Sequence, residues 1–136
     1  MSSLLVNIDV PDIDQGVAFY TQALGLRIGR RLGAGCVELL GAEVPVYLLE
    51  KSAGTRIGPA GGDTRRYDRH WSPVHLDIVV DGLEDAITLA IAAGAIQEGD
   101  ILDAPYGRLA MFADPFGHGF CLIQFSERGY DAIAGE

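Results

Sequence analysis

The sequence has few cysteines, few basic residues and no long apolar run, and each shortage excludes a class of protein. None of its 136 residues belongs to an apolar stretch approaching the ~20 residues that a membrane span requires. Its 2 cysteines are too few for a disulfide framework and favour a reducing compartment. The opening residues, MSSLLVNIDVPDID, lack the basic and then apolar segments of a secretory signal. These absences predict a cytoplasmic protein.

Positive charge is also scarce, and this limits the partners. The chain has 10 Lys and Arg against 19 Asp and Glu, for a formal net charge of -9. Nucleic acid and anionic membranes would repel such a chain, so we expect neither as a partner. Apolar residues are plentiful, because 49% of the chain is hydrophobic, and this is enough for the core of a single domain over 1–136.

The first 50 residues have the pattern of a βαβββ module. Residues 4–10 alternate with the period of a strand. Asp12 and Gln15 then have the spacing of a capping box, and Gly25 stands where the helix should end. Further strands are expected near 26–32, 35–40 and 44–50. The apolar positions expected to pack strand against helix are Val6, Ile8, Val10, Ile13, Val17, Tyr20 and Leu24.

A second module follows over about 71–126, after a connecting segment at 51–70. Residues 75–80 alternate like the first strand, and Asp81 and Glu84 repeat the capping-box spacing. The apolar positions here are Leu76, Ile78, Val80, Leu83 and Ile87, and strands are expected near 96–102, 107–113 and 118–125. The shared pattern predicts an α+β fold of two tandem βαβββ modules.

Three stretches of the sequence resemble one family. VPDIDQGVAFYTQALGL, VHLDIVVDGLEDA and ADPFGHGFCLIQF are similar to the opening, the second-module start and the closing turn and strand of the vicinal oxygen chelate superfamily. That superfamily includes glyoxalase I, bleomycin-resistance proteins and extradiol dioxygenases. The resemblance covers nearly the whole chain outside 51–70. It implies that the two modules form a cup-shaped curved sheet that takes up a small molecule, and that the protein is a homodimer. It says little about the reaction, because such a fold hosts many functions.

The resemblance also implies where a metal would bind. Metal-dependent members take one ligand from the first and one from the last strand of each module, and the matching positions here are Leu5, Tyr47, His75 and Cys121. Only His75 matches the usual histidines and glutamates. Residues 1–69 contain no histidine, so a small error of register cannot restore the first ligand. A hard dication would also lack both carboxylates. We therefore expect no metal and no other cofactor.

The remaining polar residues of the predicted cup are candidates for ligand binding. They are Asn7, Asp9, Tyr47, His75, Asp77 and Cys121. Each has a plainer interpretation: His75 as a hydrogen-bonded histidine, Cys121 as a small buried residue, and the acids as solvated side chains. The preferred function is a metal-free small-molecule-binding protein. The alternative is a lyase, isomerase or dioxygenase with catalytic His75.

That enzyme would need one of two kinds of chemistry. A rebuilt metal site could use His75, Glu50 and Cys121, the few ligands at hand. Metal-free acid–base chemistry could instead pair His75 with Asp77 or Asp9.

The connecting segment, KSAGTRIGPAGGDTRRYDRH, contains 5 of the 10 basic residues. It is long for a connection in a compact domain, so it should be functional or disordered. A mobile lid would offer Arg65, Arg66 and Arg69 to a small anionic or polar-aromatic ligand, since arginine pairs bidentately with carboxylate or phosphate. The alternative is a solvated linker without fixed structure.

Overall fold

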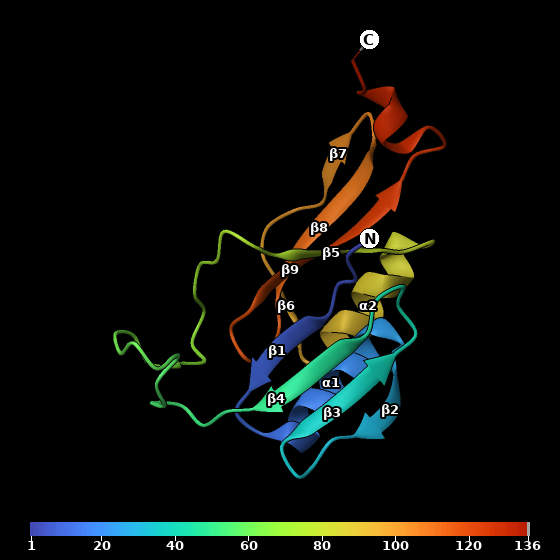
Figure 1. The fold of residues 1–136 in the computed structure, drawn as a ribbon. Coiled ribbons are helices and arrows are strands. Elements are labelled where there is room, and N and C mark those ends of the chain that lie inside the picture. The colour runs from blue at the N-terminus through green and yellow to red at the C-terminus, as the bar shows by residue number, and fades with distance from the viewer. Residues whose placement is uncertain (136) are drawn as a thin grey trace. The chain divides into compact units, whose positions relative to one another are not determined.

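The computed structural model describes residues 1–135, and the chain divides into two compact units, Met1–Asp68 and Arg69 to the C-terminus. Each unit has one α-helix packed on one sheet, and each is described by itself (Figure 1). The predicted connecting segment therefore falls almost entirely in the first unit. Within residues 1–135 no helix has the length and apolar character needed to cross a membrane. That the two units share one cup stays a prediction.

The first unit is a βαβββ module, as predicted. Its sheet has the order β1-β4-β3-β2, with β1 parallel to β4 and the other pairs antiparallel. Helix α1 lies on one face of this sheet (Figure 1). The elements are β1 (Val6–Val10), α1 (Ile13–Leu24), β2 (Arg27–Arg31), β3 (Cys36–Leu40) and β4 (Val46–Glu50).

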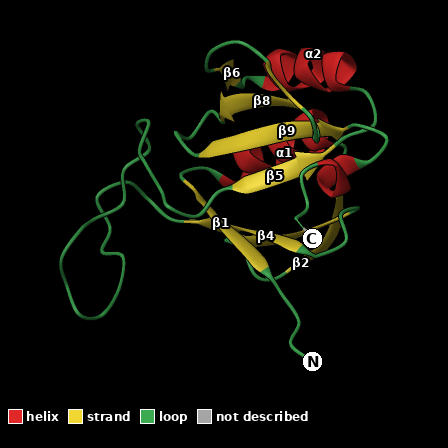
Figure 2. Ribbon diagram, turned by 90° about the horizontal axis from the view of Figure 1, so that it is seen from above, coloured by secondary structure: helices red, strands yellow, loops and turns green. Residues whose placement is uncertain are grey.

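The second unit repeats this topology, which confirms the second module. Its sheet has the order β5-β9-β8-β6, with β5 parallel to β9, and helix α2 contacts β8 and β9 (Figure 2). The strand predicted near 96–102 is instead two short strands, β6 and β7, which both pair with β8. The elements are β5 (Leu76–Val79), α2 (Leu83–Ala93), β6 (Ile96–Gln97), β7 (Leu102–Ala104), β8 (Gly107–Ala113), β9 (Gly119–Phe125) and a 3₁₀ helix at Gly129–Ala132.

Helix α1 buries a different stripe from the one predicted. Its buried residues are Gly16, Phe19, Tyr20 and Ala23, so Tyr20 alone of the four predicted positions is fully buried. The reason is the close approach of α1 to β1: a Cβ on Gly16 would lie 3.0 Å from Val10 Cγ2. Val10 is fully buried, whereas Val6 and Ile8 are half-buried.

In the second unit the core lies under α2 and between the long strands. Leu83 and Ala90 of the helix are buried, together with Ala110, Phe112, Phe120 and Leu122 of β8 and β9. Leu76 was predicted to face the helix, but it is 37% exposed. It lies on β5, which has a single neighbour in its sheet, and an edge strand is covered from one side only.

The two helices begin differently, although the sequence predicted the same cap for both. The carboxylate of Asp12 accepts a hydrogen bond of 2.9 Å from the backbone N–H of Gln15, as expected. Asp81 makes no such bond, because the N-cap of α2 is Gly82. The free N–H of Leu83 instead donates to Gln124 Oε1 of β9 at 2.8 Å. A side chain from the adjacent strand thus replaces the local cap.

This difference predicts unequal effects of two matched substitutions. Asp12→Ala removes a helix cap and should lower the free energy of unfolding by about 1 kcal/mol. Asp81→Ala removes an aspartate without a cap bond and should change it by less than ~0.5 kcal/mol. Urea unfolding followed by circular dichroism measures both. Equal losses in the two variants would show that Asp81, and not Gln124, caps α2.

Candidate functional site

Each sheet has one face that its own helix does not cover, called the open face below. The pairing of the first and last strands decides which side chains lie on it. Directly paired residues of neighbouring strands point to the same face. Asn7 of β1 pairs with Tyr47 of β4, and Asp77 of β5 pairs with Cys121 of β9. The two modules therefore place their candidate residues at equivalent positions of equivalent strands.

The open face of the first module is organised around the carboxylate of Glu38. Arg30 donates to it from Nε at 3.0 Å, from Nη2 at 2.7 Å and from its backbone N–H at 3.1 Å. The hydroxyl of Tyr47 donates to Glu38 Oε2 at 2.9 Å. Four donors thus converge on one carboxylate whose side chain is only 8% exposed. Glu38 is therefore a fixed anchor for two other side chains.

These hydrogen bonds change the acidity of both partners. The Arg30 guanidinium, followed by the Tyr47 hydroxyl, lowers the pKa of Glu38 to about 2. The hydrogen bond to the Glu38 carboxylate raises the pKa of Tyr47 above its ordinary value. Tyr47 therefore keeps its proton at neutral pH and directs it at Glu38. A protonated phenol engaged in this way is a poor metal ligand.

The other candidate residues of the first module are not among the donors to Glu38. Asp9 accepts a hydrogen bond of 2.7 Å from Arg65 Nε. Asn7 is exposed on β1. Leu5 precedes β1 and is 60% exposed. The carboxylate of Glu50 accepts from the backbone N–H of Ile13 at 2.8 Å, so it serves the start of α1.

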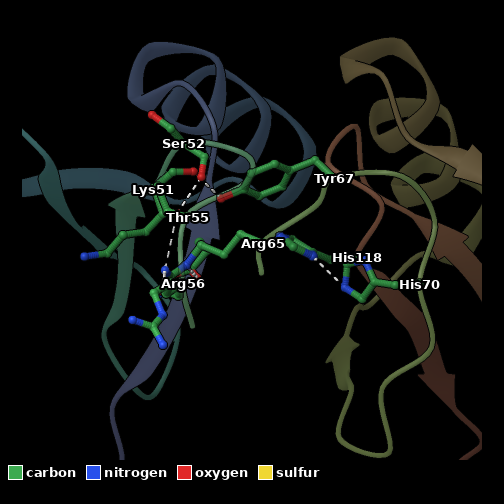
Figure 3. A network of polar contacts seen from close by, with 9 residues as sticks. Lys51, Ser52, Thr55, Arg56, Arg65, Tyr67, His70 and His118 are labelled. Carbon is green, nitrogen blue, oxygen red and sulfur yellow. Dashed lines mark hydrogen bonds and ion pairs between the residues drawn. The ribbon is translucent and has the colours of Figure 1, made fainter. Parts of the chain in front are cut away.

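The segment after β4 is a folded loop, held by bonds within itself (Figure 3). The N–H of Gly54 donates to the carbonyl of Arg65 at 2.7 Å, and the N–H of Arg65 donates to the carbonyl of Thr55 at 2.8 Å. The Tyr67 hydroxyl donates to the Lys51 carbonyl at 2.5 Å. The alternative of a linker without fixed structure does not describe this segment.

The three arginines predicted to meet an anion each lie beside a carboxylate. Arg65 pairs with Asp9, and its Nη1 also donates to the carbonyl of Arg56. Arg69 pairs with Glu98 at 2.7 Å, and its Nη1 donates to the carbonyl of His70. Arg66 is exposed, 3.9 Å from an oxygen of Asp63 and 3.7 Å from one of Asp68. Their role in binding a ligand stays a prediction.

The second module brings together three predicted site residues: His75, Asp77 and Cys121. One ligand-type atom from each lies within 4.8 Å of the others. His75 Nε2 is 3.4 Å from Asp77 Oδ1. Cys121 is buried, and burial, with the nearby Asp77 charge, raises the pKa of its thiol to about 11. At neutral pH the thiol is therefore protonated and weakly nucleophilic.

Apolar side chains surround this polar cluster. Ile123 follows Cys121 on the same face of β9 and pairs with Val79 of β5 and Leu109 of β8, while Met111 pairs with Cys121 itself. Val79 is 60% exposed and Met111 is 49% exposed. An apolar surface with a few polar groups at one end is the usual composition of a small-molecule site.

The metal implied by the family resemblance can be tested against these residues. In the first module, Leu5 has no donor atom and Tyr47 is bound through its proton to Glu38. The usual set of four ligands therefore does not fit this chain. The cluster of the second module has three donors, but a metal there would have to displace the proton of a thiol with a pKa of about 11.

Sequence reasoning missed several polar residues that the fold brings together. Glu38 and Arg30 gave one weak signal, a charged residue within the apolar stretch CVELL. His118 is a second example, since its Nδ1 lies 3.1 Å from Nε2 of His70 (Figure 3). No local pattern could find that contact, because the two histidines are 48 residues apart.

Comparisons with known proteins agree with this architecture. The family model for the glyoxalase-like domain matches residues 5–123. Among solved structures, the fosfomycin resistance protein FosX of Listeria monocytogenes is 16% identical with a TM-score of 0.69, and the alignment covers 94% of this chain and 97% of that one. None of the curated proteins compared with the chain matches it.

Two further structures have the same fold. The antibiotic binding protein TnmS3 of Streptomyces sp. CB03234 is 21% identical with a TM-score of 0.65, covering 93% of this chain and 97% of that one. A glyoxalase/bleomycin resistance protein/dioxygenase family enzyme of Burkholderia phytofirmans PsJN is 19% identical with a TM-score of 0.67, covering 90% and 97%.

The paired βαβββ modules and their open sheet faces define a protein of the vicinal oxygen chelate type. The chain belongs to the glyoxalase-like domain family, whose model spans most of its length. The resemblance seen in the three sequence stretches is thereby confirmed.

The Glu38 network predicts a pH-dependent contribution to stability. Because folding lowers the pKa of Glu38 from 4.5 to about 2, its contribution is complete above pH ~4.5 and is lost as the pH falls towards 2. Glu38→Gln should therefore destabilise the protein at pH 7 and do so much less at pH 2.5. Urea unfolding at the two pH values measures this difference.

Glu43→Gln is the matched control, since Glu43 is exposed in the loop between β3 and β4. It should have little effect at either pH. The same loss of stability in Glu38→Gln at both pH values would contradict the assigned network.

Proposed function

We propose that this chain is a small-molecule-binding protein whose modules each bind through the open face of their own sheet, without the divalent metal usual in the superfamily. One observation carries the proposal: on the second module, His75 and Asp77 lie beside the exposed apolar side chains of Val79 on β5 and Met111 on β8. The polar pair can orient a ligand by hydrogen bonds, while Val79 and Met111 supply apolar contact.

The state of the candidate metal ligands supports binding without a metal. Metal coordination needs a deprotonated cysteine. Cys121 instead has a raised pKa and lies beside the carboxylate of Asp77. Tyr47, at the corresponding position of the first module, is a hydrogen-bond donor to Glu38. Neither position offers the anionic ligand that would offset the charge of a dication.

Two of the proteins with the same fold support a small-molecule-binding function. One is titled an antibiotic binding protein and another a fosfomycin resistance protein. We propose for this chain a ligand that is anionic or polar-aromatic, a cytoplasmic location, and assembly as a homodimer. The edge strands β1 and β5 each have one neighbour in their own sheet, and such edges favour pairing with a second chain.

A second candidate function rests on the convergence of His75, Asp77 and Cys121 within 4.8 Å. Three protein ligands with an open position are the arrangement of catalytic metal sites. Without a metal, the contact between His75 and Asp77 is one that can orient an imidazole for proton transfer. Either chemistry would make the chain a lyase, isomerase or dioxygenase.

Capture of small molecules tests the proposal. The purified protein is equilibrated with the small-molecule fraction of a cell extract, filtered, and analysed by mass spectrometry. Met111→Glu adds a charge beside Cys121 and should abolish retention of the bound compound. Leu89→Glu is the matched control, since Leu89 is an apolar residue of α2 with 56% exposure and should leave retention unchanged.

The outcomes separate the two functions. A compound retained unchanged, in proportion to the protein, by the wild type and Leu89→Glu supports the binding function. A compound that disappears in large excess over the protein, with a new product, would establish the enzyme instead. Identical capture by the wild type and Met111→Glu would show that this open face binds no ligand.

A further inference from the structure

Strand β2 carries a cluster of positively charged side chains. The strand has the sequence RIGRR and contains Arg27, Arg30 and Arg31, which are 3 of the 10 basic residues of an otherwise acidic chain. All three are exposed, on the edge strand of the first sheet. Such a strand can attract an anion to a protein whose net charge of -9 would otherwise repel it.

Arg30 differs from the other arginines in how its guanidinium is held. It uses Nε and Nη2 to grip Glu38, and its contacts within residues 1–135 are with Glu38 and Tyr47. A guanidinium has five N–H groups in a rigid plane. The outer edge, formed by Nη1 and the second N–H of Nη2, remains available, and the side chain is 69% exposed.

The orientation of this outer edge is fixed by the fold. Because Glu38 is buried and accepts four hydrogen bonds, its carboxylate is held in a fixed position. The register of β2 against β3 shifts between Ile28 and Arg31, and there the backbone of Gly29 comes so close that a Cβ would lie 2.7 Å from Glu38 Oε1. The ordering of the Arg30 side chain is thus already complete before any ligand binds, which lowers the cost of binding.

Arg65 and Arg69, the two arginines of the connecting segment that bond to carboxylates at 2.7 Å, lack this free edge. Arg65 donates from Nε to Asp9 and from Nη1 to the Arg56 carbonyl. Arg69 donates from Nε and Nη2 to Glu98 and from Nη1 to the His70 carbonyl. An anion would have to compete with these partners at both ends of each guanidinium. At Arg30 no carboxylate or carbonyl among residues 1–135 is bonded to the outer edge, and the neighbouring Tyr47 hydroxyl is directed at Glu38.

The geometry points to Arg30 as the residue that binds the anionic group, a carboxylate or a phosphate, of a small molecule on the open face of the first module. Glu38 is its positioning residue. The assignment rests on the proposed ligand-binding function and names the ligand's charge. The competing explanation is that the arginines of β2 only keep this edge from pairing with another chain, a common use of charge on edge strands.

Two substitutions on the same strand separate these explanations. Arg30→Lys keeps the positive charge but removes the planar edge with its two parallel donors. Arg27→Lys makes the same chemical change at a neighbouring arginine with no carboxylate anchor. The probes are benzoate and phenyl phosphate, with benzyl alcohol as the neutral analogue, and binding is followed by NMR titration, which also reports whether each variant is folded.

We expect Arg30→Lys to weaken binding of both anions at least about tenfold, Arg27→Lys to change it less than about twofold, and benzyl alcohol not to bind at this face. Equal weakening by both substitutions would show that charge alone matters and would overturn the assignment. If Arg30→Lys does not fold, the Nε–H resonance of Arg30 in the wild type decides. It should shift on addition of phenyl phosphate, and an unshifted resonance would also overturn the assignment.

Different results would reject the role of Arg30 and the proposed function. A captured compound that depends on Met111 but binds Arg30→Lys as tightly as the wild type would leave the function standing and remove Arg30 from it. Anion binding at Arg30 without any captured compound would support the role of Arg30 and count against the proposed function.

Discussion

The parallel pairing of the first and last strand of each module is the constraint on which the rest of the structure depends. Parallel neighbours cannot be joined by a tight turn, so the chain must make a crossover between them. In the first module the crossover consists of α1 with β2 and β3, and in the second it consists of α2 with β6, β7 and β8. These strands extend the sheet, and the helix packs on one of its faces. The same pairing sets Tyr47 beside Asn7 and Cys121 beside Asp77. The positions of the candidate residues therefore follow from the strand topology alone.

Equivalent positions in the two modules have acquired different chemistry. In the first, the hydroxyl of the tyrosine on the last strand donates a hydrogen bond to a buried carboxylate, and the same carboxylate holds the guanidinium of Arg30. In the second, a buried thiol lies beside an aspartate and a partly exposed histidine, next to apolar side chains. Burial without a cationic partner favours the neutral thiol, whereas the guanidinium beside Glu38 favours the charged carboxylate. One module is thus arranged to present a cation and the other to present an apolar surface with a polar end.

Sequence patterns predicted what depends on local periodicity, and failed where contacts are distant or depend on close packing. The strand alternation and the Asp12 cap gave the order of elements and the start of α1, because these are local effects. The buried stripe of α1 was misplaced because the closeness of Gly16 to Val10 is a tertiary property. The cap of α2 comes from Gln124, which is 41 residues away from the N–H that it accepts. His75, Asp77 and Cys121 were found together because strand phase and family resemblance agree, whereas Glu38 looked like an ordinary acid in an apolar strand.

We propose that the protein binds its ligand without a metal, because the Cys121 thiol is protonated at neutral pH and the Tyr47 hydroxyl keeps its proton and donates a hydrogen bond to Glu38. Metal content measures this claim most directly: the protein is loaded with zinc, dialysed at neutral pH, and its bound metal is determined by elemental analysis. We expect the dialysed protein to contain far less than one zinc ion per chain, and His75→Ala to contain the same small amount. Nearly one zinc ion per chain that survives dialysis and is lost in His75→Ala would contradict it and establish the three-ligand site of the second module.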